Sequence, residues 1–187
     1  LGNGQIIYIG KIDKKQLRSN PESRLHNNDH FGSSVSLIGN NADGYKLAVG
    51  AYGNSNGKGA VYLFNLPEFR NGQISYVDKI DKNKLSLSSE TRLHNSDHFG
   101  SSVSLAGNNA DGYKLAVGAS GNDYGKGGAY LFNLPEFRNG QISYIDKIDK
   151  NKLSLSSEAR LYVRDHFGSS VSLIGNNADC YKLAVGA

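Results

Sequence analysis

The sequence predicts an all-β protein built from β-propeller blades, each of four antiparallel strands, that together form an incomplete ring. Three observations predict this class. A 68-residue unit recurs along the 187-residue chain, its apolar segments are short and rich in β-forming residues, and 23 glycines indicate frequent turns. A four-stranded blade has two apolar faces that it cannot cover alone, so neighbouring blades must cover them.

The repeat is visible in the segment DHFGSSVSL, which begins at Asp29, Asp97 and Asp165. Residues 29–96 and 97–164 are identical at 57 of 68 positions, which leaves eleven differing pairs. We expect four parts: the end of a preceding blade with its fourth strand and connection (1–28), two full blades (29–96 and 97–164), and the first half of a following blade (165–187).

Within one unit, four segments are expected to be strands. In 32–39, Val35 and Leu37 alternate with serines, the two-residue period of a strand. The next two segments, 45–51 and 59–66, are rich in small, β-branched and aromatic residues. The fourth is 73–80, after a turn at Asn71-Gly72. No sustained helical period is present, so we expect little helix.

Composition excludes several classes. A single cysteine cannot staple the fold, and no apolar run approaches the roughly 18 residues of a membrane-spanning helix. The net charge is +4, but the lysines alternate with acids, as in DKIDKNK. Nucleic-acid binders concentrate their positive charge, so we expect no nucleic-acid partner.

A propeller ring needs about 4–8 blades, or ~270–540 residues at this repeat length. The sequence holds two whole blades and two partial ones, so its outer sheets are expected to have open edges. Unpaired strand edges favour pairing with other strands. We therefore expect further blades or other copies of the chain to complete them.

Three motifs recur at matching spacing. They are Phe31-Gly32-Ser33-Ser34-Val35, Leu47-Ala48-Val49-Gly50-Ala51 and Gly59-Ala60-Val61-Tyr62-Leu63-Phe64. Together they resemble the FG-GAP repeat of integrin α-subunit propellers and of many bacterial surface proteins, although Tyr52 or Ser120 replaces the final proline. The resemblance implies a propeller, usually of seven blades, outside a cell or on its surface, here of a prokaryote. It also implies adhesion or ligand binding rather than catalysis.

Many FG-GAP blades hold calcium between their first two strands, with acids spaced D-x-[DN]-x-D-G-x-x-D. Here Asp43 and Asn41 fit that spacing, whereas Gly39 and Leu47 fall on the first and last ligand positions. The equivalent pair in the second unit is Asn109 and Asp111. Two side chains supply too few oxygens for calcium. We expect a tight polar turn, with Asp43 accepting backbone N–H groups, and neither calcium nor another cofactor.

No catalytic motif is present: the sequence lacks G-x-S-x-G, HExxH and a P-loop. The Asp-His pairs Asp29/His30, Asp97/His98 and Asp165/His166 could suggest a metal or acid–base site. Adjacent residues of a strand point to opposite faces, however. We expect Asp to cap the turn while His packs between blades, and we expect no enzyme.

Differences between the two units predict where a ligand binds, because they cluster in exposed segments. Loops 53–58 and 121–126 are expected at the same end of the molecule as the connections 81–96 and 149–164. Loops at binding ends vary over a constant scaffold. The candidate ligand-binding residues are Asn54, Asn56, Lys58, Asp123, Tyr124 and Lys126.

The sequence therefore favours a non-enzymatic binding or adhesion module whose partner is a protein or glycan on a surface. Two alternatives remain open. The near-identity of the units would suit a structural protein that assembles with itself, and repeated pockets around a ring would suit a carbohydrate-binding lectin.

Overall fold

The structure is a computed structural model that describes residues 11–14, 17, 21–40, 44–66, 74–85, 89, 91–137, 141–153, 160–176 and 180–187. It confirms the prediction of an all-β fold made of four-stranded antiparallel sheets, and the described residues form no closed barrel. The predicted fourth strand of the preceding blade, near the start of 1–28, and the predicted turn at 71–72 lie outside the described residues, except 11–13.

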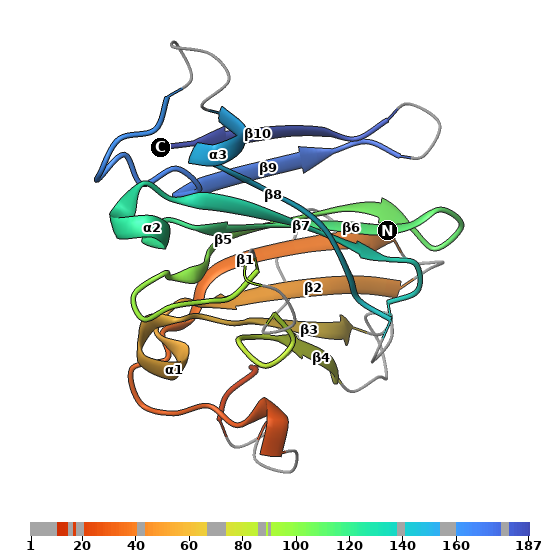
Figure 1. Ribbon diagram of the computed structural model, residues 1–187. Helices are drawn as coiled ribbons and strands as arrows, with labels where there is room; N and C mark the ends of the chain where they lie inside the picture. Colours follow the sequence, from red (N-terminus) through yellow and green to blue (C-terminus); the bar gives the residue numbers. More distant parts are fainter. Residues whose placement is uncertain are drawn as a thin grey trace, which may run out of the picture.

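The described strands form three sheets that follow one another along the chain (Figure 1). Within each sheet, neighbouring strands are antiparallel. The first sheet contains β1 (Phe31–Asn40), β2 (Gly44–Ala51), β3 (Val61–Leu66) and β4 (Ser75–Ile80). The second contains β5 (Phe99–Asn108), β6 (Gly112–Ala119), β7 (Gly128–Leu134) and β8 (Ser143–Asp149). The third pairs β9 (Ser170–Ile174) with β10 (Lys182–Gly186).

The helices are single turns: η2 (Pro21–Ser23), α1 (Asn54–Gly57), α2 (Asn122–Gly125) and α3 (Lys150–Leu153). α1 and α2 occupy the loops between the second and third strands of the two complete sheets. Figure 1 shows both at the same end of the molecule, whereas the β5–β6 hairpin turn lies at the opposite end. The prediction of little helix is therefore confirmed for the described residues.

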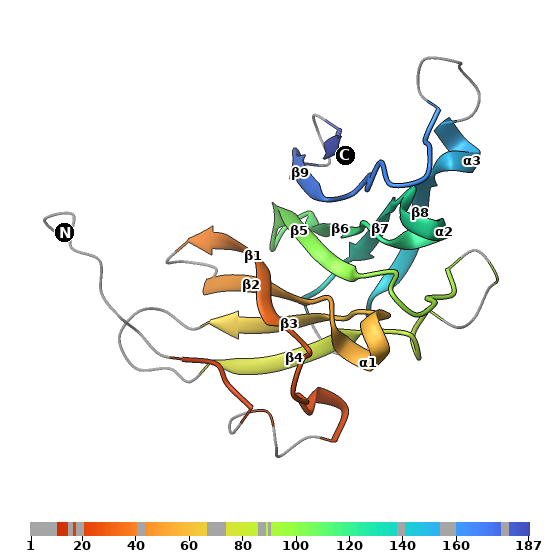
Figure 2. The same ribbon diagram turned by 90° about the vertical axis from the view of Figure 1, so that its left-hand side faces the viewer.

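The sheets lie as successive layers, with β5–β8 between β1–β4 and β9 (Figure 2). The largest apolar cluster lies at the boundary of the first two sheets. It joins β3 residues such as Val61 and Leu63 to β5 residues such as Phe99 and Leu105. Each four-stranded sheet thus covers its neighbour with an apolar face, as the blade prediction requires.

Serines on the first strand of each blade bind the next blade. Ser34 donates to the carbonyl of Gly100 at 2.8 Å, and the Oγ of Ser36 accepts the N–H of Leu105 at 2.9 Å. The same two hydrogen bonds recur one unit later. Ser102 donates to the carbonyl of Gly168 at 2.8 Å, and the Oγ of Ser104 accepts the N–H of Leu173 at 2.9 Å. The serine face of the first strand therefore lies at the boundary between blades, where it contacts the next blade.

Glycine is required where the backbones of adjacent blades meet. A Cβ on Gly50 would lie 2.0 Å from the carbonyl oxygen of Gly100, and one on Gly118 would lie 1.9 Å from that of Gly168. Gly59 has a φ of +90°, and its Cβ would lie 1.9 Å from the carbonyl oxygen of Phe99. These contacts explain two recurring glycines by close backbone approach.

Val35 and Leu37 on β1 are 64% and 57% exposed. Their equivalents in the second blade, Val103 and Leu105, are 7% and 6% exposed because the first blade covers them. Within the described residues, a neighbouring sheet thus covers this pair of side chains in the second blade and not in the first.

Candidate functional site

The loop between β6 and β7 holds two consecutive non-glycine residues in the left-handed conformation. Asp123 has a φ of 49° and Tyr124 a φ of 58°. The turn is closed by the N–H of Gly125, which donates to the carbonyl of Gly121 at 3.0 Å. Such backbone costs roughly 1–3 kcal/mol and is tolerated best by Asn and Asp. Tyr124 is held in this strained conformation while its side chain is 87% exposed.

Asp97 anchors this loop to the connection that precedes the blade. Its carboxylate is 3% exposed and accepts the N–H of His94 at 2.7 Å and the Nδ2 group of Asn122 at 3.1 Å. Asp29 and Asn54 form the same contact in the first blade, at 3.0 Å. The aspartate thus caps the turn, as the sequence predicted.

Asn54 needs a correction for this reason. The sequence places it among the candidate ligand contacts, but it is 4% exposed and donates to Asp29. Its side-chain amide links the loop to Asp29 in the interior. The sequence could not separate it from its exposed neighbour Asn56, because both are asparagines in one short polar segment.

The turn around Ser96 lies between the loops of the two blades. Its N–H donates to the carbonyl of Asn56 at 3.3 Å, and the N–H of His98 donates to that of Gly57 at 2.8 Å. On the other side, the N–H of Gly121 donates to the carbonyl of Asp97 at 3.1 Å. These backbone contacts support the prediction that loops 53–58 and 121–126 lie at the same end of the molecule as the connection 81–96.

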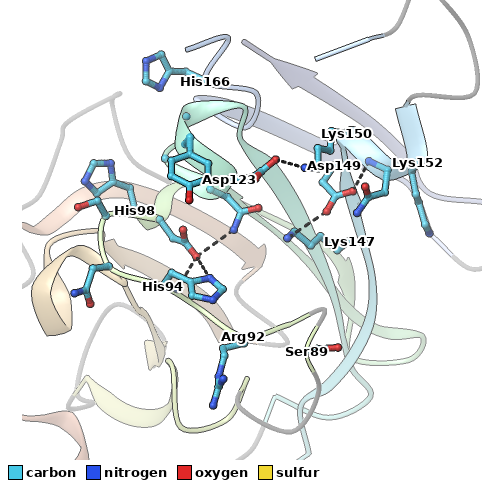
Figure 3. Close-up of a pocket in the computed structure, with 18 of the residues that line it drawn as sticks. Ser89, Arg92, His94, His98, Asp123, Lys147, Asp149, Lys150, Lys152 and His166 are labelled. Carbon is cyan, nitrogen blue, oxygen red and sulfur yellow. Dashed lines mark hydrogen bonds and ion pairs between the residues drawn. The ribbon is translucent and has the colours of Figure 1, made fainter. Parts of the chain in front are cut away.

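These segments enclose a cleft of about 940 Å³, which we call the blade-two cleft. Its walls come from the connection before β5, the α2 loop, the end of β8 with α3, and the turn after α3 (Figure 3). Its charged and aromatic lining residues are Arg92, His94, Asp97, His98, Asp123, Tyr124, Tyr144, Asp146, Lys147, Asp149, Lys150, Lys152, Arg164 and His166.

Ion pairs hold the acidic side of the cleft. Asp123 lies 2.7 Å from the Nζ of Lys150, Asp149 lies 3.3 Å from that of Lys147, and Asp146 pairs with Lys152. The hydrogen bond from Lys150 lowers the pKa of the Asp123 carboxyl, and the same bond raises the pKa of Lys150. Both groups therefore keep their charges at neutral pH.

The other candidate residues have different positions. Asp123 and Tyr124 line the cleft, whereas Lys126 supports it from outside through an ion pair with Asp123 at 3.4 Å. Asn56 is exposed and Lys58 is half-buried at the neighbouring boundary, where the carbonyl of Lys58 accepts the N–H of Phe99. The structure thus brings two of the six candidates into one cleft.

Sequence reasoning missed the cationic lining residues as a group. A signal for Arg164 was available, because it is one of the differing positions and replaces Ser96 of the first unit. Arg92 and the three lysines are constant between units, so variation could not reveal them. Only the fold shows that the DKIDKNK segment faces the loop of its own blade.

The histidines of the Asp-His pairs pack at the same end. His30 stacks on Tyr52 with ring centroids 4.6 Å apart, and His98 of the next blade meets the same tyrosine edge-on at 5.4 Å. In the second blade Ser120 replaces the tyrosine, and Nδ1 of His166 lies 3.2 Å from its carbonyl oxygen. These positions fit the expected packing between blades.

The loop at the opposite end of the second blade forms a polar turn. The Oδ1 atom of Asn108 accepts the N–H groups of Ala110 and Asp111 at 2.9 and 2.8 Å, and its Nδ2 donates to the Asp111 carboxylate. Tyr113 donates to Asn109 at 2.7 Å. In this loop the side chain of Asn108, the residue before the turn, therefore accepts both N–H groups.

Asn41 and Asp43 of the first unit lie outside the described residues. Among the residues that the structure describes, no three His, Cys, Asp or Glu side chains lie together as a metal site. We predict that millimolar calcium will leave the melting temperature unchanged, because the oxygens of Asn108 and Asn109 already accept hydrogen bonds. Thermal unfolding with calcium and with EDTA tests this, and a calcium-dependent rise that Asp111→Ala abolishes would contradict it.

The packed layers, the serine contacts between them and the cleft at their loop end define a segment of a β-propeller. Residues 25–64 match the family model of the FG-GAP repeat. The equivalent segment of the next unit, 93–132, differs from this region at few positions, and both units fold into the same four-stranded sheet, so the second unit is similar to the FG-GAP repeat as well. Among curated proteins, none matches the chain significantly.

FG-GAP repeats are typical of extracellular proteins, and they suggest a propeller-like module for binding or adhesion. None of the described helices is long and apolar enough to cross a membrane.

Proposed function

We propose that the protein is a non-enzymatic binding and adhesion module of a prokaryotic cell surface or secreted protein, which holds a polar ligand in the blade-two cleft. One observation carries the proposal. Eleven pairs of equivalent residues differ between the two units, and in five of these pairs at least one residue lines this cleft. The contributing residues are His94, Asn95, Ser96, Asp123, Tyr124 and Arg164.

The remaining six pairs lie outside the cleft lining, and most are conservative. Examples are the valine–isoleucine pair Val77/Ile145 and the small-residue pair Ala60/Gly128. Among these six, Ile38/Ala106 and Tyr52/Ser120 change strongly in size, but none changes in charge. Around the cleft, Ser55 is replaced by Asp123, Asn56 by Tyr124 and Ser96 by Arg164, so two of these three changes add a charge. This pattern is typical of binding loops carried by a rigid framework.

Tyr124 supports the proposal independently. A tyrosine in the left-handed conformation destabilises the loop relative to the asparagine that stands there in the first unit. Its ring is almost fully exposed, so packing does not offset this cost. Exposed tyrosines supply large, rigid contact areas in binding sites, which accounts for its presence.

The non-enzymatic part of the proposal rests on the carboxylates. Asp123, Asp146 and Asp149 are each paired with a lysine, and Asp97 is buried as a loop anchor. General bases are instead positioned to accept a proton from substrate. Such an arrangement suits recognition of shape and charge.

A variant that gives the second loop the residues of the first, Asp123→Ser with Tyr124→Asn, tests the proposal. The first unit already carries these residues on the same scaffold, so folding should be preserved. We expect loss of binding on a glycan array and on cell surfaces. The control Ala110→Arg, at the opposite end, should bind as the unaltered chain does; unchanged binding by the loop variant together with loss in the control would place the site at the wrong end.

A second candidate function, self-assembly, is favoured by the exposure of Val35 and Leu37. Their equivalents in the second blade are buried by the preceding sheet. Another copy of the chain that presents a comparable sheet face could cover them. Concentration-dependent association in analytical ultracentrifugation, abolished by Val35→Glu, would support this candidate.

A further inference from the structure

We infer that the ligand of the blade-two cleft is a carboxylate-bearing oligosaccharide, recognised chiefly by Arg164, Arg92 and the ring of Tyr124. This inference rests on the proposed function and names its ligand class. It follows from the charges that remain uncompensated in the cleft, from how they are spaced, and from the groups between them.

The cleft is lined by five lysines and arginines and by four aspartates. Three of the aspartates pair with the three lysines, and the fourth, Asp97, is buried and hydrogen-bonded. Within the part of the chain that the structure describes, neither Arg92 nor Arg164 has an acidic partner at ion-pair distance, and both side chains are exposed. The charge left for a ligand is therefore positive and belongs to arginine.

Arginine favours a particular kind of anion. Its planar guanidinium donates two parallel hydrogen bonds that match the oxygens of a carboxylate or a phosphate. The lysines each pair with an aspartate, so their charge is already largely compensated. Among the described residues, the two arginines thus favour an oxyanion of this kind, and the sugar-binding groups between them lead us to assign the carboxylate of an acidic sugar.

The volume of the cleft and the distribution of its cations suit an extended ligand. Figure 3 shows Arg92 at one end of the cleft and His166 at the other, and Arg164 belongs to the same turn as His166. A chain that carries carboxylates at intervals can contact both arginines and occupy a volume near the upper end of the usual range for ligand pockets.

The groups between the arginines suit sugars. Tyr124 offers an exposed ring face, and Asn95, Ser96 and Asn151 line the cleft with amide and hydroxyl groups. An aromatic face packs against the apolar face of a sugar ring, while amides and hydroxyls bind its hydroxyl groups. A nucleic acid would need more unpaired cations along its closely spaced phosphates.

A smaller cleft one unit earlier provides an internal comparison. It has about 220 Å³ and is lined by Arg24, His26 and Asn27, the equivalents of Arg92, His94 and Asn95. The residues that correspond to Tyr124 and Arg164 in that unit are Asn56 and Ser96. Arginine is thus common to both clefts, whereas the tyrosine and second arginine distinguish the larger one.

The experiment measures binding of a galacturonic acid hexasaccharide and of its methyl ester by isothermal titration calorimetry. The two probes share every sugar ring and differ only in the charged carboxylates. We expect binding of the acid alone, weakened by added salt. Arg164→Ser and Tyr124→Asn, which install first-unit residues, should each weaken it about ten- to a hundredfold, whereas Lys182→Ser, an exposed charge on β10, should not.

The outcomes separate this inference from the proposed function. Equal binding of acid and ester, reduced by Tyr124→Asn, would overturn the carboxylate class while leaving a binding module. Preference for single-stranded DNA or an acidic peptide in the same site would also overturn it. No detectable binding of the acid at millimolar concentration overturns the inference, and the array and cell-surface screen then decides the proposed function separately.

Discussion

Gly118→Ala is expected to destabilise the protein by about 3 kcal/mol or more, which is a large fraction of the stability of a domain. Its new Cβ would lie 1.9 Å from the carbonyl oxygen of Gly168 and 2.3 Å from the Oγ of Ser102. The carbonyl belongs to the backbone of the next blade, so relief requires the two sheets to separate. That movement would also break the hydrogen bond from Ser102 to Gly168. Urea unfolding followed by circular dichroism measures the loss.

Gly128→Ala is the matched control. Alanine stands at the equivalent position of the first unit, Ala60, and a Cβ on Gly128 would come closest to the flexible end of Lys147 at 3.2 Å, with Asn122 and the Ile148 carbonyl at an ordinary 3.6 Å. The substitution should be neutral or stabilise the strand by up to about 1 kcal/mol. Equal stability of the Gly118 and Gly128 variants would show that the blades are not packed as closely as described.

Leu105→Ala is expected to cost about 2–5 kcal/mol, because the side chain is buried in the largest apolar cluster. Leu37→Ala removes the same atoms from the same position of the first unit, where the side chain is 57% exposed. Its cost should be within about 0.5 kcal/mol. Denaturant unfolding of both variants at low protein concentration gives the two values directly.

The comparison between these leucines also reports on what covers the first blade. A cost for Leu37→Ala that approaches the cost for Leu105→Ala only at high protein concentration would indicate a second copy on the open face. If the two substitutions lowered the free energy of unfolding equally at all protein concentrations, the description of Leu37 as an exposed side chain would be wrong.

Much of the fold could be predicted because strand signals are local. The alternation of Val35 and Leu37 with serines, and the turn glycines, identify the strands from neighbouring residues alone. The repeat then supplies the packing, since near-identical units must form near-identical sheets. Two strand starts shift by two residues: the third begins at Val61 and not at 59, where Gly59 bridges to Phe99 of the next blade, and the fourth begins at Ser75 and not at 73.

The candidate site could be predicted only in part, because it depends on contacts between segments far apart in sequence. Variation pointed to Asp123 and Tyr124, which do line the cleft. It could not reveal Arg92, whose position is constant, nor show that Asn54 is buried beneath its loop. The left-handed conformation of Tyr124 has no local signal either, since tyrosine is a poor residue for it.

The serine contacts between blades have an evolutionary consequence. Ser34 reaches a partner 66 residues ahead and Ser36 one 69 residues ahead, and the same separations recur from Ser102 and Ser104. Each contact thus links one unit to the next at a fixed separation, so duplication or deletion of one whole unit by recombination leaves each remaining blade with its donors and acceptors intact. Recombination can then exchange whole units that differ in their loops, and new binding specificities can arise without any change in the scaffold.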